Sequence, residues 1–151
     1  MALPAHIDLQ IVTPEKMIVH QAVDEVEIPG TDGYFGVLPG HTPLLASLAV
    51  GELWYRVGQE KTYLSIAFGF AEVLPDRVTI LARLAERAED IDVERAAAAR
   101  KRAEELLAHA RPNVDYERAR VALMKSVSRL HVVSHVAGGS MKRIREAANR
   151  G

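Results

Sequence analysis

The stretch IPGTDGYFGVLPGHTPLLASL, which runs from Ile28 to Leu48, concentrates glycine and proline around a single histidine, His41. Glycine tolerates positive φ angles and proline fixes φ at about −65°, so this composition predicts a tight, rigid loop. A loop held in this way presents a surface to a partner. The stretch then runs directly into an apolar segment.

Two chemical interpretations of the stretch fit the residues poorly. The segment GVLPGHT has three residues between its glycines and a histidine where a phosphate loop has four residues and a lysine. A catalytic histidine needs a nucleophile or an orienting carboxylate, and only Asp32 and Thr42 are near His41 in sequence. A hydrolase that uses His41 is therefore the weakest of the functional alternatives.

The sequence on either side of the stretch is typical of β structure. Apolar and polar residues alternate in HIDLQIVT, which predicts a half-buried strand, and KMIVHQAVDEVEI continues the β pattern. ELWYRVGQEKTYLSIAF predicts a hairpin that turns at residues 58–60, and FAEVLPDRVTILAR predicts another that turns at residues 75–76. Several short strands at this spacing predict a sandwich or a barrel.

Near residue 88 alanine, arginine and glutamate replace the β-branched residues. Asp92 is a good N-cap for a helix with alanines at a spacing of three and four, and Asp115 caps a second helix after the break RPN. The predicted fold class is α+β, with an N-terminal antiparallel β-sandwich and a C-terminal antiparallel two-helix hairpin. The predicted domains are residues 1–87, residues 88–135, and a basic tail, residues 136–151, which contains a hinge at Gly138–Gly139 and forms a short helix or a disordered end.

Composition excludes several classes of protein. The formal net charge is −1, which argues against nucleic-acid binding, and the absence of cysteine excludes disulfides and thiol chemistry. No apolar run approaches the roughly 18 residues of a membrane-spanning helix, and the first residues do not resemble a signal peptide. We expect a cytoplasmic soluble protein that meets a membrane only through a partner.

The charge is divided unevenly along the chain. Residues 1–87 carry 6 Lys or Arg against 11 Asp or Glu, a net of −5, whereas residues 88–151 carry 13 against 9, a net of +4. The two parts are therefore expected to meet different partners. Because alanine buries little apolar area, we also expect the hairpin to dock weakly. The free energy of docking is then within reach of a ligand, since a ligand at 100 times its Kd supplies roughly 2.7 kcal/mol. A hairpin of this kind is suited to a conformational change.

Two sets of side chains on the predicted helices are candidate ligand sites. Arg95 and Arg102 are seven residues apart on the first helix, and Lys125 and Arg129 are four apart on the second, so each pair shares a face. If the hairpin closes, the four cations converge, and a nucleotide polyphosphate would hold them together. The alternative is a set of solvated cations with nearby glutamates as partners.

His131 and His135 form a second candidate site, since a spacing of four residues places two imidazoles on one helix face as metal ligands. The sequence offers no third ligand, and whether the helix extends this far is open. Solvated or capping histidines are the alternative.

The chain resembles the epsilon subunits of bacterial F-type ATP synthases over roughly residues 5–132. The resemblance lies in IPGTDGYFGVLPGHTPLLASL, in AFGFAEVLPDRVTILA and in the two-helix ending. It implies a β-sandwich followed by a helical hairpin, and a non-catalytic rotor subunit on the central stalk. The implied partners are the gamma subunit and the c-ring, and the implied location is the cytoplasmic face of the bacterial cell membrane.

The same resemblance assigns the stretch around His41 to contacts with gamma and the c-ring. The implied contact residues are Tyr34, Gly40, His41 and Pro43. Tyr34 stands where one family member carries an acidic residue, which implies a more apolar contact with the c-ring in this chain.

The resemblance also implies that the hairpin regulates. Folded down, it permits turnover, and extended, it reaches the alpha and beta catalytic subunits and blocks ATP hydrolysis; the net +4 of this part suits acidic surfaces there. Some relatives bind ATP through an I/L-D-x-x-R-A motif, and no other cofactor is required, with the need for Mg²⁺ left open. The motif and its associated positions fall on Glu86, Ile91, Asp92, Arg95, Ala96, Arg102, Lys125 and Arg129, where Lys125 replaces a family arginine. The alternative to a subunit is a free-standing ATP sensor, in which the hairpin is the ligand site.

Overall fold

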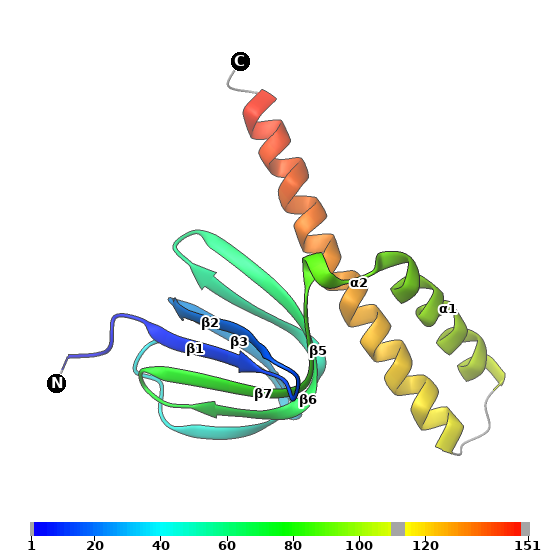
Figure 1. The fold of residues 1–151 in the computed structure, drawn as a ribbon, viewed down its shortest axis with the longest axis horizontal. Coiled ribbons are helices and arrows are strands. Elements are labelled where there is room, and N and C mark those ends of the chain that lie inside the picture. Colours follow the sequence, from blue (N-terminus) through cyan, green and yellow to red (C-terminus); the bar gives the residue numbers. More distant parts are fainter. Residues whose placement is uncertain (1, 110–113, 149–151) are drawn as a thin grey trace. The chain divides into compact units, whose positions relative to one another are not determined.

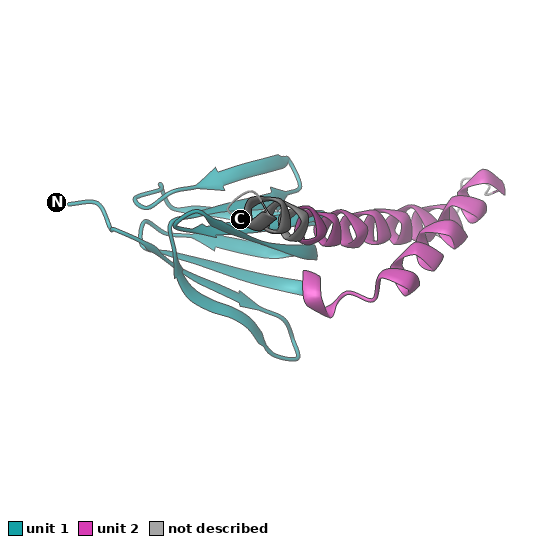
Figure 2. Cartoon of the chain, turned by 90° about the horizontal axis from the view of Figure 1, so that it is seen from above, with its two compact units in different colours: residues 1–87 teal, residues 88–151 magenta. Residues whose placement is uncertain are grey.

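The computed structural model describes residues 2–109 and 114–148, and divides the chain into two compact units at Arg87 and Ala88. Residues 1–87 form the first, called here the β unit, and residues 88–151 form the second, called the helical unit (Figure 2). The division lies where the composition of the sequence changes.

The β unit is one seven-stranded sheet with the order β2-β1-β7-β6-β5-β3-β4 (Figure 1). Its strands are β1 (Ile7–Val12), β2 (Met17–Val23), β3 (Glu25–Gly30), β4 (Gly33–Val37), β5 (Leu44–Val57), β6 (Glu60–Val73) and β7 (Arg77–Arg87). Neighbouring strands are antiparallel, except that β1 pairs with β7 in parallel. The predicted hairpin turns at residues 58–60 and 75–76 are confirmed.

The sheet covers itself. Residues from all seven strands form one buried cluster, although no helix is described in residues 2–87 that could cover them. Members of the cluster with no exposed surface include Ile7, Leu9, Ile11, Val23, Val26, Ile28, Val37, Leu53, Leu64, Ile66, Val78 and Ile80. Strands from the two edges of a sheet can share a core only when the sheet folds over, so the predicted sandwich is confirmed.

A bend in three strands makes this folding possible. In β6 the buried residues are even-numbered at Leu64 and Ile66 but odd-numbered at Ala71 and Val73, so the strand exchanges its inner and outer faces near Phe68. The burial patterns of β5 and β7 change at the level that pairs with this point. The register of β6 with β5 and with β7 is unbroken across this point, so the three strands bend together.

Glycine is required at the bend. Phe68 has a φ of 61° and Gly69 has a φ of 122°, which is a backbone conformation that side chains disfavour. A Cβ atom on Gly69 would overlap the carbonyl oxygen of Leu81 on β7. The glycine of the FGF sequence therefore lets the backbones of β6 and β7 approach closely.

The segment KMIVHQAVDEVEI, predicted as β structure, forms two strands. The structure divides it at Asp24 into β2, which pairs with β1, and β3, which pairs with β4 and β5. The main-chain N–H of Asp24 donates to the Arg56 carbonyl over 2.8 Å, and the Gly58 N–H donates to the Asp24 carboxylate over 2.7 Å. These bonds hold the corner between the two strands.

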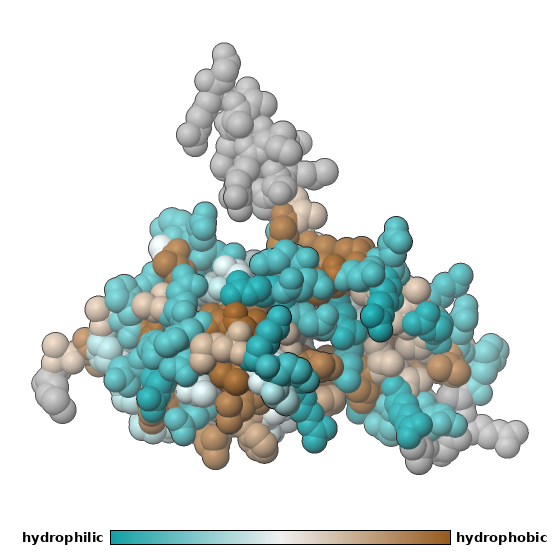
Figure 3. Space-filling view, viewed as in Figure 1, coloured by the Kyte–Doolittle hydropathy of each residue, from teal (hydrophilic) through white to brown (hydrophobic). Residues whose placement is uncertain are grey.

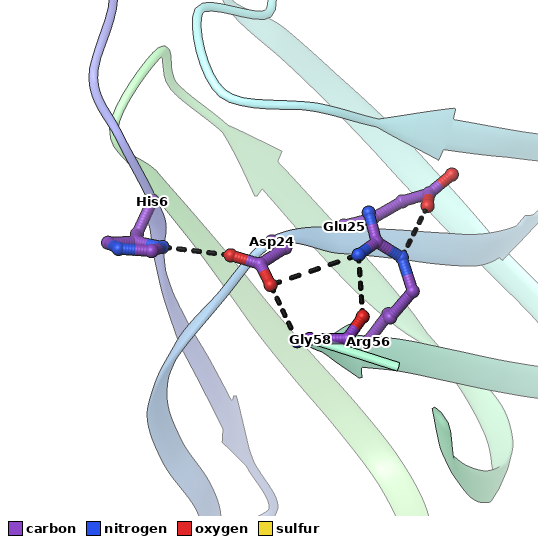
Figure 4. A network of polar contacts seen from close by, with 5 residues as sticks. All are labelled: His6, Asp24, Glu25, Arg56 and Gly58. Carbon is purple, nitrogen blue, oxygen red and sulfur yellow. Dashed lines mark hydrogen bonds and ion pairs between the residues drawn. The ribbon is translucent and has the colours of Figure 1, made fainter. Parts of the chain in front are cut away.

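Figure 4 shows the polar network around this corner. His6 Nδ1 lies 2.9 Å from Asp24 Oδ1, and Arg56 binds Glu25 over 3.1 Å and approaches Asp24 at 3.8 Å. The Gly58 N–H, the His6 ring and the Arg56 guanidinium all favour the charged carboxylate, so they lower the pKa of Asp24 below its usual value of 3.8. The network ties the start of β1 to the β5–β6 turn.

The stretch from Ile28 to Leu48 was predicted to form a tight loop around His41, and the structure has a strand before that loop. Gly33–Val37 forms β4, an edge strand that pairs with β3 through a turn at Thr31 and Asp32. Gly33 supplies the positive φ of 128° that this turn needs. The true loop is confined to residues 38–43.

The helical unit contains a short 3₁₀ helix η1 (Ala88–Asp90) and two α-helices, α1 (Val93–His109) and α2 (Val114–Ala148). Asp92 Oδ1 accepts the Arg95 N–H over 3.0 Å, which confirms it as the N-cap of α1. The predicted break, RPN, lies outside the described residues. The two helices pack on each other as an antiparallel hairpin, which confirms the predicted fold class.

The predicted hinge and most of the predicted tail lie within one helix, α2. The helix α2 continues through Gly138 and Gly139 to Ala148, and Gly138 is not among the residues with positive φ. Glycine lowers helix stability by about 1 kcal/mol relative to alanine but does not prevent helical backbone angles, so two glycines inside a long helix need not break it. Residues 149–151 lie outside the described part of the chain.

We predict that Gly69→Ala destabilises the β unit by about 3 kcal/mol, because it combines an unfavourable φ with overlap at the Leu81 carbonyl. Gly33→Ala is the matched control, since its φ is similar but nothing lies within 4 Å of its added Cβ. It should cost only about 1–2 kcal/mol. Denaturant unfolding followed by the fluorescence of the single tryptophan, Trp54, measures both, and equal losses would contradict the role of close approach.

Candidate functional site

The loop at residues 38–43, between β4 and β5, is held by the main chain. The Gly40 N–H donates to the Pro75 carbonyl over 2.7 Å, and the His41 N–H donates to the Leu38 carbonyl over 3.2 Å. Gly40 has a φ of 85°, which explains a glycine at this position. Rigid anchoring of this kind presents the loop in one conformation.

His41 shows no arrangement for catalysis. Its Nδ1 lies 2.6 Å from the Thr42 carbonyl oxygen, and because a carbonyl can only accept, Nδ1 carries the proton. A catalytic base is oriented by a carboxylate or another acceptor that leaves a nucleophile within reach, whereas this ring is tied to the backbone of the next residue. The geometry therefore favours a structural role for His41 in the loop.

Tyr34, predicted as part of the contact loop, lies on the edge strand β4 instead. Its hydroxyl oxygen accepts the Glu52 N–H over 3.1 Å, and its ring lies over Gly51, where an added Cβ would overlap the hydroxyl. The β3–β5 pairing is irregular between Glu27 and Gly30, opposite this point, so the tyrosine takes the place of a missing ladder bond. Tyr34 nevertheless remains 57% exposed.

Apolar side chains gather on the surface beside the loop. Tyr34, Leu38, Leu44 and Leu45, called here the apolar loop surface, are 57%, 56%, 40% and 71% exposed. Tyr34, Leu44 and Leu45 also line a pocket of about 480 Å³. Figure 3 shows apolar side chains reaching the surface of the β unit. Exposed apolar clusters of this kind mark interaction sites in soluble proteins.

Sequence reasoning missed the three leucines of this surface. The signal was present, because LL in HTPLLASL places an apolar residue on both faces of the start of β5, and one of the two must face outward. Pro43, which was predicted, is exposed and lines a second pocket of about 300 Å³ with Leu44 and Leu45.

The helical hairpin has a seam of small residues. Ala96 and Ala103 are 3% and 2% exposed on α1, and Ala119 and Ser126 are 3% and 1% exposed on α2. Ala103 lies seven residues before the connection at residues 110–113 and Ala119 lies six residues after it, and Ala96 and Ser126 lie 14 and 13 residues away. In an antiparallel hairpin each pair is therefore expected at about the same level.

This seam places the predicted cations on one edge. Arg95 and Arg102 each precede a buried alanine by one residue, and Lys125 precedes the buried Ser126, so each projects about 100° away from the seam. In a pair of antiparallel helices, positions offset in the same sense from the seam lie on the same side. Arg129, four residues after Lys125, shares that side.

The cations are not all at one level. Arg95 lies at the level between Lys125 and Arg129, whereas Arg102 lies seven residues further along α1, about 10 Å away along the axis. Arg95 and Arg102 are exposed, and Lys125 and Arg129 are half-buried. On this count three of the predicted cations are expected at similar levels, and the fourth lies two turns further on.

The remaining predicted ATP-binding residues are engaged structurally. Ile91 is 8% exposed, Ala96 lies in the seam, and one carboxylate oxygen of Asp92 caps α1. Glu86 lies near the end of β7 and is half-buried. Capping uses one oxygen of Asp92, so its other oxygen could still face a ligand.

His131 and His135, the predicted metal pair, both lie inside α2. Their ring centroids are 4.9 Å apart with an interplanar angle of 71°.

None of the helices in the described residues is both long and apolar enough to cross a membrane.

Two family models match the chain in succession. Residues 6–88 match the model described as ATP synthase, Delta/Epsilon chain, beta-sandwich domain, and residues 89–134 match ATP synthase, Delta/Epsilon chain, long alpha-helix domain. The boundary between the matches lies one residue beyond the boundary between the units of the structure. The last part of α2 lies outside both.

Curated relatives and solved structures agree with these matches. The chain is 54% identical to the ATP synthase epsilon chain of Syntrophobacter fumaroxidans over 126 residues, which is 83% of this chain and 94% of that protein. It is 46% identical to the epsilon chain of Nitratidesulfovibrio vulgaris, with the same coverage. A chain of the Euglena gracilis mitochondrial ATP synthase superposes with a TM-score of 0.75 at 26% identity, covering 91% of this chain and 84% of that one.

Proposed function

This chain belongs to the delta/epsilon chain family of ATP synthase, and from that premise we propose that it is a rotor subunit of the central stalk in a bacterial F-type ATP synthase. It is an epsilon subunit and carries no catalytic activity of its own. Its role is to couple ion translocation to ATP synthesis and to regulate ATP hydrolysis. The β unit attaches the chain to its partners, and the helical unit regulates.

One observation supports this function above the others: the apolar loop surface is exposed in the isolated chain. Leu45 is 71% exposed although it belongs to the first part of a strand in a well-packed sheet. Exposed leucines are unfavourable for a free-standing protein but are what an obligate partner would cover. We assign this surface, with the rigid loop beside it, to the gamma subunit and the c-ring.

ATP is the regulatory ligand in this proposal. Arg95, Lys125 and Arg129 project from the same side of the seam at similar levels, where the oxygens of a polyphosphate would accept hydrogen bonds from all three. Bridging the two helices with a polyphosphate would hold the hairpin closed. Lys125 supplies charge without the two-pronged geometry of arginine, so we expect weaker binding than an arginine would give.

The hairpin inhibits when it opens and extends towards the alpha and beta subunits. Its seam is built from alanine and serine, which bury much less apolar area than leucine or isoleucine would. The closed form is therefore held weakly enough for ATP to stabilise it and for its loss to release it. A free-standing ATP sensor remains the second candidate, but it leaves the exposed leucines without a purpose.

Replacing Leu45 by glutamine should weaken association with the gamma–c-ring subcomplex at least tenfold, which corresponds to about 1.4 kcal/mol. The side chain is mostly exposed, so folding should be unaffected. Met17→Gln is the matched control, since Met17 is 50% exposed on β2, outside the apolar loop surface. Surface plasmon resonance measures both, and equal affinities for the two variants would count against the assignment.

Replacing Arg95 by alanine should weaken ATP binding at least tenfold, because a phosphate loses one of three converging cations. Arg100→Ala is the control, since Arg100 is also on α1 but pairs with Glu104 on the other side of the seam, over 2.9 Å. Lys125→Arg should tighten binding. Isothermal titration with and without Mg²⁺ measures all three. Unchanged affinity in Arg95→Ala would refute the assignment.

Removing residues 89–151 should raise ATP hydrolysis by the reconstituted complex while leaving its assembly intact, because the β unit has a core of its own. The measurement compares steady-state hydrolysis with the full-length and the shortened chain. Identical rates would show that the helical unit does not inhibit, and failure to associate with gamma would contradict the attachment role of the β unit. The isolated full-length chain should hydrolyse no ATP.

A further inference from the structure

The paired histidines of α2 are not used by the function proposed above. His131 and His135 are four residues apart on a continuous helix, so one turn of backbone separates them and both lie on the same face. Their rings meet edge to face with centroids 4.9 Å apart, and one ring nitrogen of each lies within 4.8 Å of the other. Two imidazoles are thus already arranged side by side.

The regular backbone answers the question that the sequence left open. A helix that ended near residue 131 would have separated the rings, but α2 runs from Val114 to Ala148, well beyond both histidines. The same spacing, two histidines one turn apart, provides two zinc ligands in the H-E-x-x-H helices of metalloproteases. Only the metal-ligand geometry is shared, because this segment reads HVVSH and lacks the glutamate.

The distances suit one bound ion. Zinc–nitrogen bonds are about 2.0–2.1 Å, so two nitrogens on one ion are at most about 4.2 Å apart. A separation within 4.8 Å closes to this value by small rotations of the two rings. Imidazole nitrogen is a preferred ligand of Zn²⁺, Ni²⁺ and Cu²⁺, and water completes the coordination of such ions where protein ligands are few.

We propose that His131 and His135 form a two-imidazole binding site for a divalent transition-metal ion. Residues one turn away on the same face are Val127 and Ser128 on one side and Gly138 on the other, and none carries a charge. The helix itself therefore places no cation against the ion. None of the proposed ATP-binding residues belongs to this site.

A metal at this position would stiffen α2 where it needs support. The helix α2 continues past both histidines to Ala148. Gly138 and Gly139, which are poor helix formers, follow one turn later. An ion that joins two successive turns stabilises the helix across this segment.

The test is isothermal titration of ZnCl₂ and NiCl₂ into the full-length chain without an affinity tag. We expect one ion per chain, and at least tenfold weaker binding in His131→Ala and in His135→Ala. His109→Ala is the matched control, because His109 is an exposed histidine on α1, and it should bind as the wild type does. Circular dichroism confirms that each variant keeps its helices.

A spacing variant separates a defined site from a general affinity for histidine. His135→Ala combined with Val136→His keeps the number of histidines but moves one ligand about 100° around the helix. Val136 is 50% exposed, so the change is tolerated, and we expect binding as weak as in His135→Ala. Retained affinity in either alanine variant or in the spacing variant, or no binding by the wild type, would overturn the proposal.

Hydrogen exchange gives an independent measurement of the stiffening. Zn²⁺ should slow exchange of the amides at residues 131–138 in the wild type and leave them unchanged in His135→Ala. Equal exchange in the wild type with and without the ion would overturn the proposed effect on α2.

Discussion

The close approach of Gly69 to the Leu81 carbonyl is the constraint on which the β unit depends. It allows β5, β6 and β7 to exchange their inner and outer faces at one level, so a single sheet folds over and buries its own core. Because the sheet buries its own core, its outer face is available for partners. The loop at residues 38–43 is anchored to the same sheet through the Gly40–Pro75 hydrogen bond, which holds the apolar loop surface in place.

The two units are stabilised to different degrees, and their proposed roles follow from this. The β unit buries isoleucine, leucine and valine from all seven strands, whereas the hairpin seam buries alanine and serine. Because the free energy of burial follows apolar area, the first is suited to permanent attachment and the second to a change of state. A weak seam also lets a small ligand or one metal ion influence the helices.

Much of this structure follows from local patterns in the sequence. Alternation predicted the strands, the alanine spacing and Asp92 predicted α1, and the family motif located Arg95. The failures have physical causes. Asp24 ends a strand only because Gly58 and Arg56, distant in sequence, bond to it, and Gly138 was taken as a hinge although glycine tolerates helical angles.

By itself the sequence determined the division into an acidic β unit and a basic helical unit. Composition and periodicity are local properties, so they can be read before the fold is known. Only the tertiary structure decided which side chains meet. Tyr34 took up a backbone bond at Glu52, and Leu45 was left outside the core. These outcomes depend on strand register, which residues far apart in the chain determine together.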